Sequence, residues 1–203
     1  MGRKSLKKIR QKEIIEAFYK VAQKEGLENA SLAKVANEMD VNPSLVLHYF
    51  GAKEELLFGL IRFIMKRYKF LYTSENNKGD NGSKLKNIIN NLFSREWNDL
   101  VDDGVFYSCF SLVFRSEKIK AAYKDLHENL RFLLAEAIEE AKNNGETEVE
   151  CSKEAADLIF ILVEGSYYYL SLYEMDKDYH KKLHKYKNAA FDILKIKNVT
   201  ESP

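Results

Sequence analysis

The chain of 203 residues contains little proline, threonine and valine. Its two prolines are Pro43 and Pro203, so no proline interrupts a helix between residues 44 and 202. Three threonines and ten valines are few for a sheet protein, because strands favour β-branched residues. Hydrophobic residues make up 45% and charged residues 31%, which is typical of a globular chain. The composition therefore predicts an all-α fold.

Cysteine and long apolar runs are also scarce. Cys109 and Cys151 are 42 positions apart, which predicts neither a disulfide framework nor a zinc cluster. The longest strongly apolar run, Leu158–Val163, is much shorter than the roughly 20 residues that a transmembrane helix needs. The basic residues 1–12 lead into a polar stretch and not into the apolar core of a signal peptide. We expect a cytoplasmic protein without membrane contact.

The motifs of common catalytic chemistries are missing from the sequence. It contains no Gly-x-Ser-x-Gly elbow, no glycine-rich phosphate loop and no His-Glu-x-x-His pair. His180 and His184 are four residues apart and could share a metal on a helix, but no nearby acidic residue clearly completes a ligand set. A solvated, lysine-rich helix is the other interpretation. We expect no enzyme, no cofactor and no metal site.

Charge is distributed unevenly, although the net charge is only +1. Residues 1–72 contain 14 lysines and arginines against 8 acidic residues, whereas the remainder contains 18 against 23. Six of the basic residues precede the first acidic residue, Glu13. A basic front half favours a module that binds a polyanion, although a solvated tail has the same composition.

Three helices are predicted in this basic part. Apolar residues recur at helical spacing from Lys7 to Lys24, and Gly26 ends that helix. Ser31 is a suitable N-cap for a short second helix, Leu32–Met39.

The third predicted helix is also short and follows after three residues. Asp40 tolerates the left-handed conformation that a tight turn needs. Asn42 suits the N-cap and Pro43 the first helical position of a helix that runs to about Tyr49. Two short helices joined by such a turn form a helix-turn-helix unit. Its second helix buries little of itself, so its value lies in what its exposed face contacts.

The residues from Ser31 to Leu57 resemble the N-terminal signature of the TetR/AcrR family of transcriptional regulators. The shared features are the short helix, the turn, the sequence His-Tyr-Phe at residues 48–50 and the sequence Lys-Glu-Glu-Leu-Leu that ends at Leu57. Together with residues 26–31, the His-Tyr-Phe sequence is similar to the choline-responsive, glycine-betaine-type branch. Two positions depart from the pattern: Asp40 stands at the usual turn glycine, and Leu47 replaces a tyrosine that in many members contacts a DNA phosphate.

The resemblance implies that the helix starting at Pro43 enters the major groove of DNA. The N-terminal residues of such a helix read base edges, and flanking groups hold the phosphates. Leu45 and His48 could instead be core residues. Residues Arg3–Lys8 are expected to be a disordered arm that orders in the minor groove. The predicted groove contacts are Asn42, Pro43, Ser44, Leu45 and His48, and the predicted phosphate contacts are Ser31, Lys34, Tyr49 and Lys53.

Long helical patterns continue beyond Lys53, apart from a polar loop at residues 75–82. We divide the chain into a helix-turn-helix DNA-binding domain, residues 1–52, and a helical effector-binding and dimerisation domain, residues 53–203. The predicted helices are Lys53–Tyr72, Ser83–Val101, Val105–Arg115, Glu117–Asn143, Ser152–Met175 and Lys177–Lys197.

The resemblance implies about nine helices, of which the last two form the interface of a homodimer. Gly165 would allow close approach of two helix backbones at that interface. The candidate interface residues are Leu158, Ile161, Leu162, Gly165, Tyr169 and Leu172 on the first of these helices and Ala189, Ala190, Ile193 and Leu194 on the second.

The resemblance also implies a small-molecule pocket, and a repressor that leaves its operator when the pocket is filled. An aromatic wall could hold an apolar effector or an organic cation, with Glu164 as the neutralising charge. The same rings could simply fill a helical core, so a regulator without an effector stays open. A helical module that binds protein instead of DNA also stays open. The predicted ligand-binding residues are Trp97, Tyr107, Phe110, Phe114, Glu164 and Tyr168.

Overall fold

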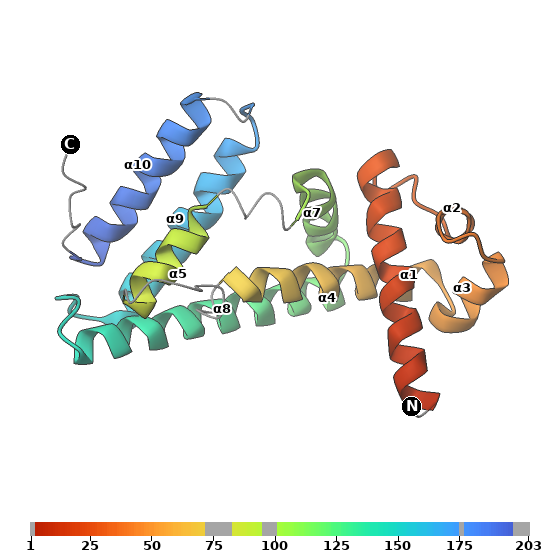
Figure 1. Cartoon of the computed structure of the whole chain (residues 1–203), viewed down its shortest axis with the longest axis horizontal. Coiled ribbons are helices and arrows are strands. Elements are labelled where there is room, and N and C mark those ends of the chain that lie inside the picture. Colours follow the sequence, from red (N-terminus) through yellow and green to blue (C-terminus); the bar gives the residue numbers. More distant parts are fainter. Residues whose placement is uncertain (1–2, 72–82, 95–100, 175–176, 197–203) are drawn as a thin grey trace. The chain divides into compact units, whose positions relative to one another are not determined.

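The computed structural model describes residues 3–71, 83–94, 101–174 and 177–196, and this part of the chain is helical without any strand (Figure 1). The all-α prediction is confirmed. The α-helices are α1 (Arg3–Glu25), α2 (Leu32–Glu38), α3 (Pro43–Phe50), α4 (Lys53–Leu71), α5 (Lys84–Leu92), α7 (Asp103–Phe110), α8 (Glu117–Asn143), α9 (Ser152–Leu170) and α10 (Lys177–Ile193), and η2 (Ser111–Phe114) is a 3-10 helix.

The chain forms two compact units that are not continuous in sequence. The first comprises residues 1–67 and 101–123, and the second comprises residues 68–100 and 124–203. Helices α4 and α8 each run from one unit into the other. The first unit therefore combines the three N-terminal helices and most of α4 with α7, η2 and the start of α8. The functional boundary at residue 52 stays a prediction.

In the first unit, α2 and α3 pack against α1 (Figure 1). Their shared core contains Phe18 of α1, Val35 of α2 and Val46 of α3, all of which are fully buried. This core sets the orientation of the two short helices, which are too short to be stable alone.

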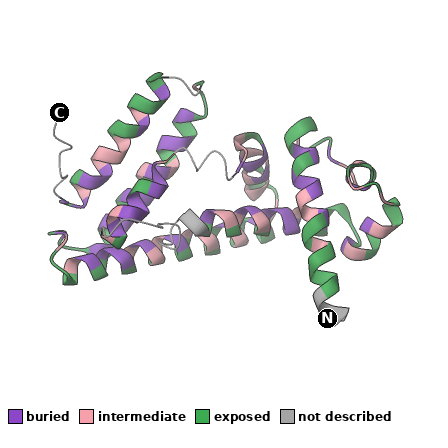
Figure 2. Cartoon of the chain, viewed as in Figure 1, coloured by how far each residue is buried: buried purple, intermediate pink, exposed green. Residues whose placement is uncertain are grey.

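The expectation of a disordered arm at Arg3–Lys8 is wrong, because α1 already begins at Arg3. Lysine, arginine, leucine and glutamine have high helix propensity, and neither glycine nor proline occurs between Arg3 and Glu25. The helix therefore extends beyond the packed core, and most residues from Leu6 to Glu13 are exposed (green in Figure 2).

The predicted helix Ser83–Val101 is too long. Helix α5 ends at Leu92, and Phe93 leaves the helical conformation with φ −115° and ψ 46°. The hydroxyl of Tyr167 lies 2.9 Å from the carbonyl oxygen of Leu92 and 3.1 Å from that of Ser94. A side chain distant in sequence thus satisfies carbonyl groups at this helix end. The rest of the predicted helix, apart from Ser94 and Val101, lies outside the described residues.

Three other predicted helices also end elsewhere. The segment Val105–Arg115 divides into α7 and η2, α9 ends at Leu170, and α10 ends at Ile193. Lys195 has a left-handed φ of 51°, which does not continue a helix. By contrast, α8 has the predicted bounds.

In the second unit, α9 and α10 lie side by side (Figure 1). One face of α9 is buried, with Ile159, Phe160 and Val163 in the core. Along the ribbon of α9, buried positions therefore alternate with half-buried and exposed positions (Figure 2). Among the described residues, none of the helices combines the length and the apolar character that a bilayer crossing requires.

Candidate nucleic-acid interface

The turn between α2 and α3 is fixed by capping groups and by one left-handed residue. The hydroxyl of Ser31 accepts a hydrogen bond from the main-chain nitrogen of Lys34 at 3.3 Å. The side-chain oxygen of Asn42 accepts one from the main-chain nitrogen of Ser44 at 2.9 Å. Asp40 has φ 53°, as the turn was expected to require. Each short helix therefore begins at a defined residue, which fixes the outward face of α3.

Helix α3 has a buried face and an exposed face. Val46 and Phe50 are buried against the unit's own core. Ser44, Leu47 and His48 are exposed and share the opposite face, because they are three and four residues apart. The exposure of His48 argues against its being a core residue.

The other predicted groove contacts divide between exposed and half-buried positions. Asn42 and Pro43 are exposed at the N-terminus of α3, whereas Leu45 and Tyr49 are half-buried. Because the oxygen of Asn42 already caps the helix, only its amide nitrogen is left to contact a base. These assignments stay predictions.

Leu47 belongs to the same exposed face, although the sequence did not mark it as a contact. Its exposed fraction is 46%, which is high for a leucine on a helix that packs against a core. In a major groove, an exposed leucine offers apolar contact, for which the thymine methyl group is the natural partner. The helical spacing from Ser44 to Leu47 is the signal that could have identified it.

The candidate phosphate-binding lysines have local partners in the free protein. The ammonium group of Lys34 pairs with the carboxylate of Glu25. That of Lys53 donates to the main-chain oxygen of Glu28 at 3.4 Å. Both lysines therefore lie near the connection between α1 and α2. Each also belongs to the first turn of its own helix, and the positive end of a helix dipole favours an anion.

Helix α1 adds positive charge beyond the helix-turn-helix. Lys7, Lys8 and Lys12 are exposed on its N-terminal half, and Arg10, also exposed, pairs with Glu13 at 2.7 Å. A rigid, basic helix end can hold a phosphate backbone as a disordered arm does, without the entropy loss of ordering on binding.

Two contacts support the position of α3 from behind. The side-chain nitrogen of Gln11 donates to the main-chain oxygen of Tyr49 at 3.3 Å. At Gly59 of α4, an added Cβ would lie only 3.0 Å from Ile15 and 3.2 Å from Phe50. Glycine therefore lets α4 approach both α1 and α3 closely. The sequence gives no local signal for either contact.

The predicted effector-binding residues are distributed over both units. Trp97 lies outside the described residues. Tyr107 and Phe110 are half-buried on α7 in the first unit, where the rings of Phe110 and Tyr123 are 5.5 Å apart. Phe114 is 82% exposed on η2 in the same unit.

Glu164 and Tyr168 lie on α9 in the second unit. One carboxylate oxygen of Glu164 is shielded from solvent and has no hydrogen-bond partner among the described residues. Burial raises the pKa of this carboxyl to about 7. Tyr168 is exposed. An unpaired, buried carboxyl is costly in free energy, so Glu164 is the most distinctive of the predicted ligand residues.

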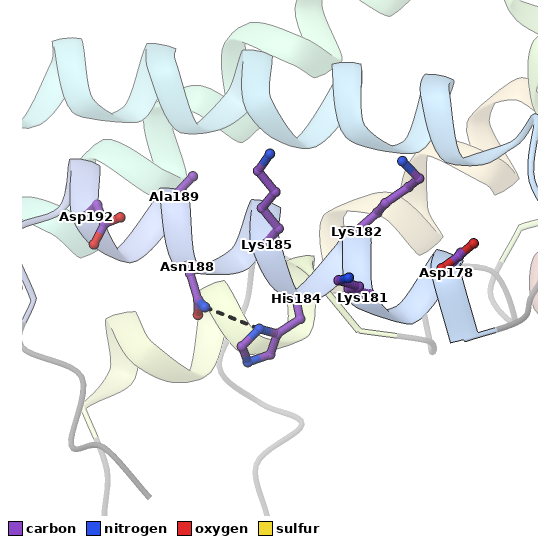
Figure 3. A pocket seen from close by; sticks show the side chains of 8 residues that line it. All are labelled: Asp178, Lys181, Lys182, His184, Lys185, Asn188, Ala189 and Asp192. Carbon is purple, nitrogen blue, oxygen red and sulfur yellow. Dashed lines mark hydrogen bonds between the residues drawn. The ribbon is translucent and has the colours of Figure 1, made fainter.

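A lysine-rich hollow of about 760 Å³ lies along α10 (Figure 3). Within it, a ring nitrogen of His184 is hydrogen-bonded to the amide of Asn188 at 3.2 Å. Nowhere in the described ranges do three or more histidine, cysteine, aspartate or glutamate side chains gather as metal ligands would. The absence of a metal at His180 and His184 stays a prediction. The hollow is lined by Asp178, Lys181, Lys182, His184, Lys185, Asn188, Ala189 and Asp192.

Comparison with known proteins finds a matching family model for the N-terminal part of the chain and another for the C-terminal part. The family model of bacterial regulatory proteins of the tetR family matches residues 14–60, and that of the tetracyclin repressor-like C-terminal domain matches residues 80–196. The HTH-type transcriptional regulator BetI of Paraburkholderia phytofirmans is 31% identical over 99 residues, which cover 47% of this chain and 50% of BetI. The chain thus matches about half the length of this relative.

Two solved structures share the fold. A TetR transcription regulator from Haloarcula marismortui has a TM-score of 0.74 at 14% identity, covering 93% of this chain and 97% of that one. A transcriptional regulator from Saccharomonospora viridis, solved in complex with choline, has a TM-score of 0.71 at 15% identity, covering 91% and 96%. With family models matching both the helix-turn-helix and more than half of the chain beyond it, this protein belongs to the TetR family of DNA-binding transcriptional regulators and is not an enzyme.

Proposed function

We propose that this regulator is a homodimeric repressor that binds an operator in duplex DNA and leaves it when a small-molecule effector binds. The observation that carries the DNA-binding part is the outer face of α3, where Ser44, Leu47 and His48 are exposed while Val46 and Phe50 anchor the opposite face. A protein whose partner is the operator works in the compartment that holds the DNA, which in a bacterium is the cytoplasm.

Selection of bound fragments from random genomic DNA tests this proposal. The protein should enrich one sequence motif with two half-sites about one helical turn apart, because a two-fold symmetric dimer presents two copies of α3. Enrichment without any motif, or no enrichment at low salt, would contradict the proposal and favour a helical module that binds protein.

The Lys53→Ala variant should bind every duplex more weakly. Loss of one phosphate contact in each half-site, two per dimer, is expected to lower affinity at least tenfold and to reduce the slope of log K against log salt by about 1.8. Electrophoretic mobility shifts at several salt concentrations measure both quantities. Lys124→Ala, an exposed lysine on α8, is the matched control and should change neither. Unchanged affinity in the Lys53 variant would remove this residue from the interface.

The Ser44→Ala variant should change sequence preference more than affinity for random DNA. Its hydroxyl is exposed on the groove-facing side of α3, and one base contact discriminates by about 1–3 kcal/mol. Competition between the selected operator and its single-base variants measures this discrimination. If the order of preference among those variants stays the same, Ser44 does not read a base.

The homodimer is supported by an exposed stripe on α9. Its residues recur every three or four positions, so they form one continuous line along the helix. Gly165 lies within this line, and an added Cβ there would meet nothing within 4 Å. A continuous apolar line open to solvent favours a second copy of the chain as its partner. The α9 stripe consists of Leu158, Ile161, Gly165, Tyr168 and Tyr169 on the helix and of Leu172 in the turn just beyond its end.

Two of the candidates on α10 must be corrected. Ala190 and Leu194 are fully buried within the protomer and have no surface to offer a partner, whereas Ala189 and Ile193 are half-buried. On α10 the exposed positions are all polar or charged, among them Lys181 and Lys185. The apolar part of the proposed interface therefore lies on α9.

For the effector, the buried carboxyl of Glu164 favours an organic cation. A cation beside it would neutralise a charge whose shielded oxygen otherwise has no partner among the described residues. Choline is the first probe, because the structurally similar regulator from S. viridis was solved with it. The mutual packing of Phe106, Phe110 and Tyr123 supports the alternative, in which α7 aromatics fill a core and no effector exists.

A further inference from the structure

Tyr19 joins two helices that are far apart in the sequence. Its side chain lies on the buried face of α1, and its hydroxyl oxygen accepts a hydrogen bond from the main-chain nitrogen of Asp102 at 2.7 Å. The two residues are 83 positions apart, and both belong to the first compact unit. The bond therefore reports a tertiary arrangement and not a local turn.

Asp102 is also the residue at which α7 begins. Its side-chain oxygen accepts a hydrogen bond from the main-chain nitrogen of Val105 at 2.9 Å, which makes it the N-cap of the helix. Asp102 thus caps α7 with its side chain and binds Tyr19 of α1 through its main-chain nitrogen. If the N-terminus of α7 moves along α1, the hydrogen bond between Asp102 and Tyr19 must break, or the side chain of Tyr19 must move as well.

Helix α4 meets the same side chain. The ring of Tyr19 lies 5.8 Å from that of Phe63, and the guanidinium of Arg67 lies over both rings, at 5.2 Å from Tyr19 and 4.3 Å from Phe63. Burial is the main cause that raises the pKa of the Tyr19 phenol, which therefore stays neutral at physiological pH. Three helices of the first unit meet at one tyrosine.

The helices on the two sides of this contact carry different functions. Next to Tyr19, Phe18 and Ala22 of α1 are buried in the core that orients α2 and α3. On the other side, α7 carries Tyr107 and Phe110, which are candidates for effector contact. The contact between Tyr19 and Asp102 is therefore a direct physical link between the two groups of residues.

We infer that Tyr19 is a positioning residue that couples α7 to the DNA-binding helices, so that DNA bound at α3 changes the state of α7 and a shift of α7 changes affinity for DNA. The inference rests on the proposed function, because it requires a duplex that the protein binds. By thermodynamic linkage the coupling is reciprocal, so it can be measured from the DNA side before any effector is identified.

The test compares hydrogen exchange of the full chain with and without a duplex selected from random-sequence DNA. In the wild type, DNA should slow exchange at residues 101–110 as well as in α2 and α3. The Tyr19→Phe variant keeps the ring that packs on Phe63 and Arg67 and lacks only the acceptor. It should bind the duplex within about twofold of the wild type, yet lose the response at residues 101–110. Tyr186→Phe, which removes a hydroxyl from α10, should respond as the wild type does.

A second variant removes the other half of the hydrogen bond. Asp102 has φ −67°, which a proline ring adopts, so Asp102→Pro deletes the N–H donor and leaves Tyr19 intact, but it also removes the carboxylate that caps α7. Asp102→Pro should lose the same response. Asp102→Ala, which loses the same cap and keeps the N–H, is the matched control and should keep the response. An undiminished response at residues 101–110 in both Tyr19→Phe and Asp102→Pro overturns the inference, as does a wild type in which DNA leaves these residues unchanged. If no duplex is selected at all, the proposed function itself fails, and the binding assay reveals this before any exchange is measured.

Discussion

The Ile161→Glu variant should be monomeric at concentrations where the wild type is a dimer. Ile161 is 68% exposed near the middle of the α9 stripe. In a two-fold symmetric dimer the substitution enters the interface twice and places two like charges in an apolar contact. Burial of an unpaired carboxylate costs several kcal/mol, so the dimer should dissociate at least 100-fold more readily. Sedimentation velocity over a concentration series measures this change.

A matched control is available on α8. Phe132 is 60% exposed, comparable to Ile161, but it does not belong to the α9 stripe. Phe132→Glu introduces the same charge into the same compact unit and should remain dimeric. Monomeric Ile161→Glu should also lose most of its operator affinity, because one copy of α3 reaches only one half-site. A stable dimer of the Ile161 variant would place the interface elsewhere.

The beginnings of α2 and α3 could be predicted from the sequence because their causes are local. Ser31, Asn42 and Pro43 act within three residues of the helix that they start, and each has the role that its residue type indicates. Helix ends proved harder. Helix α5 ends beside the hydroxyl of Tyr167, a residue on α9, and no pattern within residues 83–101 contains that information.

The candidate site shows the same difference between features with local causes and features that depend on distant residues. The resemblance to a recognition helix is why Ser44 and His48 could be named in advance, and both are exposed on α3, whereas Leu45 is half-buried. Gln11, Gly59 and Tyr19 could not be named, since their roles depend on which distant residue the fold brings beside them. The proposed effector residues stay predictions, because an aromatic side chain serves a core and a pocket equally well.

The Glu164→Gln variant should remove a strong pH dependence of stability. The folded protein holds this carboxyl at a pKa of about 7, whereas its ordinary value is 4.5. Between these values the folded state binds a proton that the unfolded chain has released, so the unfolding free energy falls as pH rises from 4.5 to 7. Above pH 7 the folded protein no longer gains stability from the protonated carboxyl. A difference of this size corresponds to about 3 kcal/mol at most.

Urea denaturation of wild type and variant at pH 5, 6, 7 and 8 measures this effect. Relative to the wild type, Glu164→Gln should gain up to about 3 kcal/mol between pH 5 and pH 8. Glu154→Gln, an exposed glutamate on the same helix, is the matched control, and its difference from the wild type should stay constant. A constant difference for the Glu164 variant as well would show that its carboxyl is hydrated.

The same carboxyl links pH to the proposed cationic effector. A cation prefers the ionised form, so choline chloride should stabilise the wild type at pH 8 by RT ln(1 + [L]/Kd), about 2.7 kcal/mol at 100 times Kd. At pH 5 the effect should be much smaller, because binding must first remove the proton. Sodium chloride at equal concentration controls for ionic strength, and the Glu164→Gln variant should gain little from choline at either pH. Equal stabilisation of wild type and variant would place the cation away from Glu164, and no stabilisation of the wild type would exclude choline as the effector.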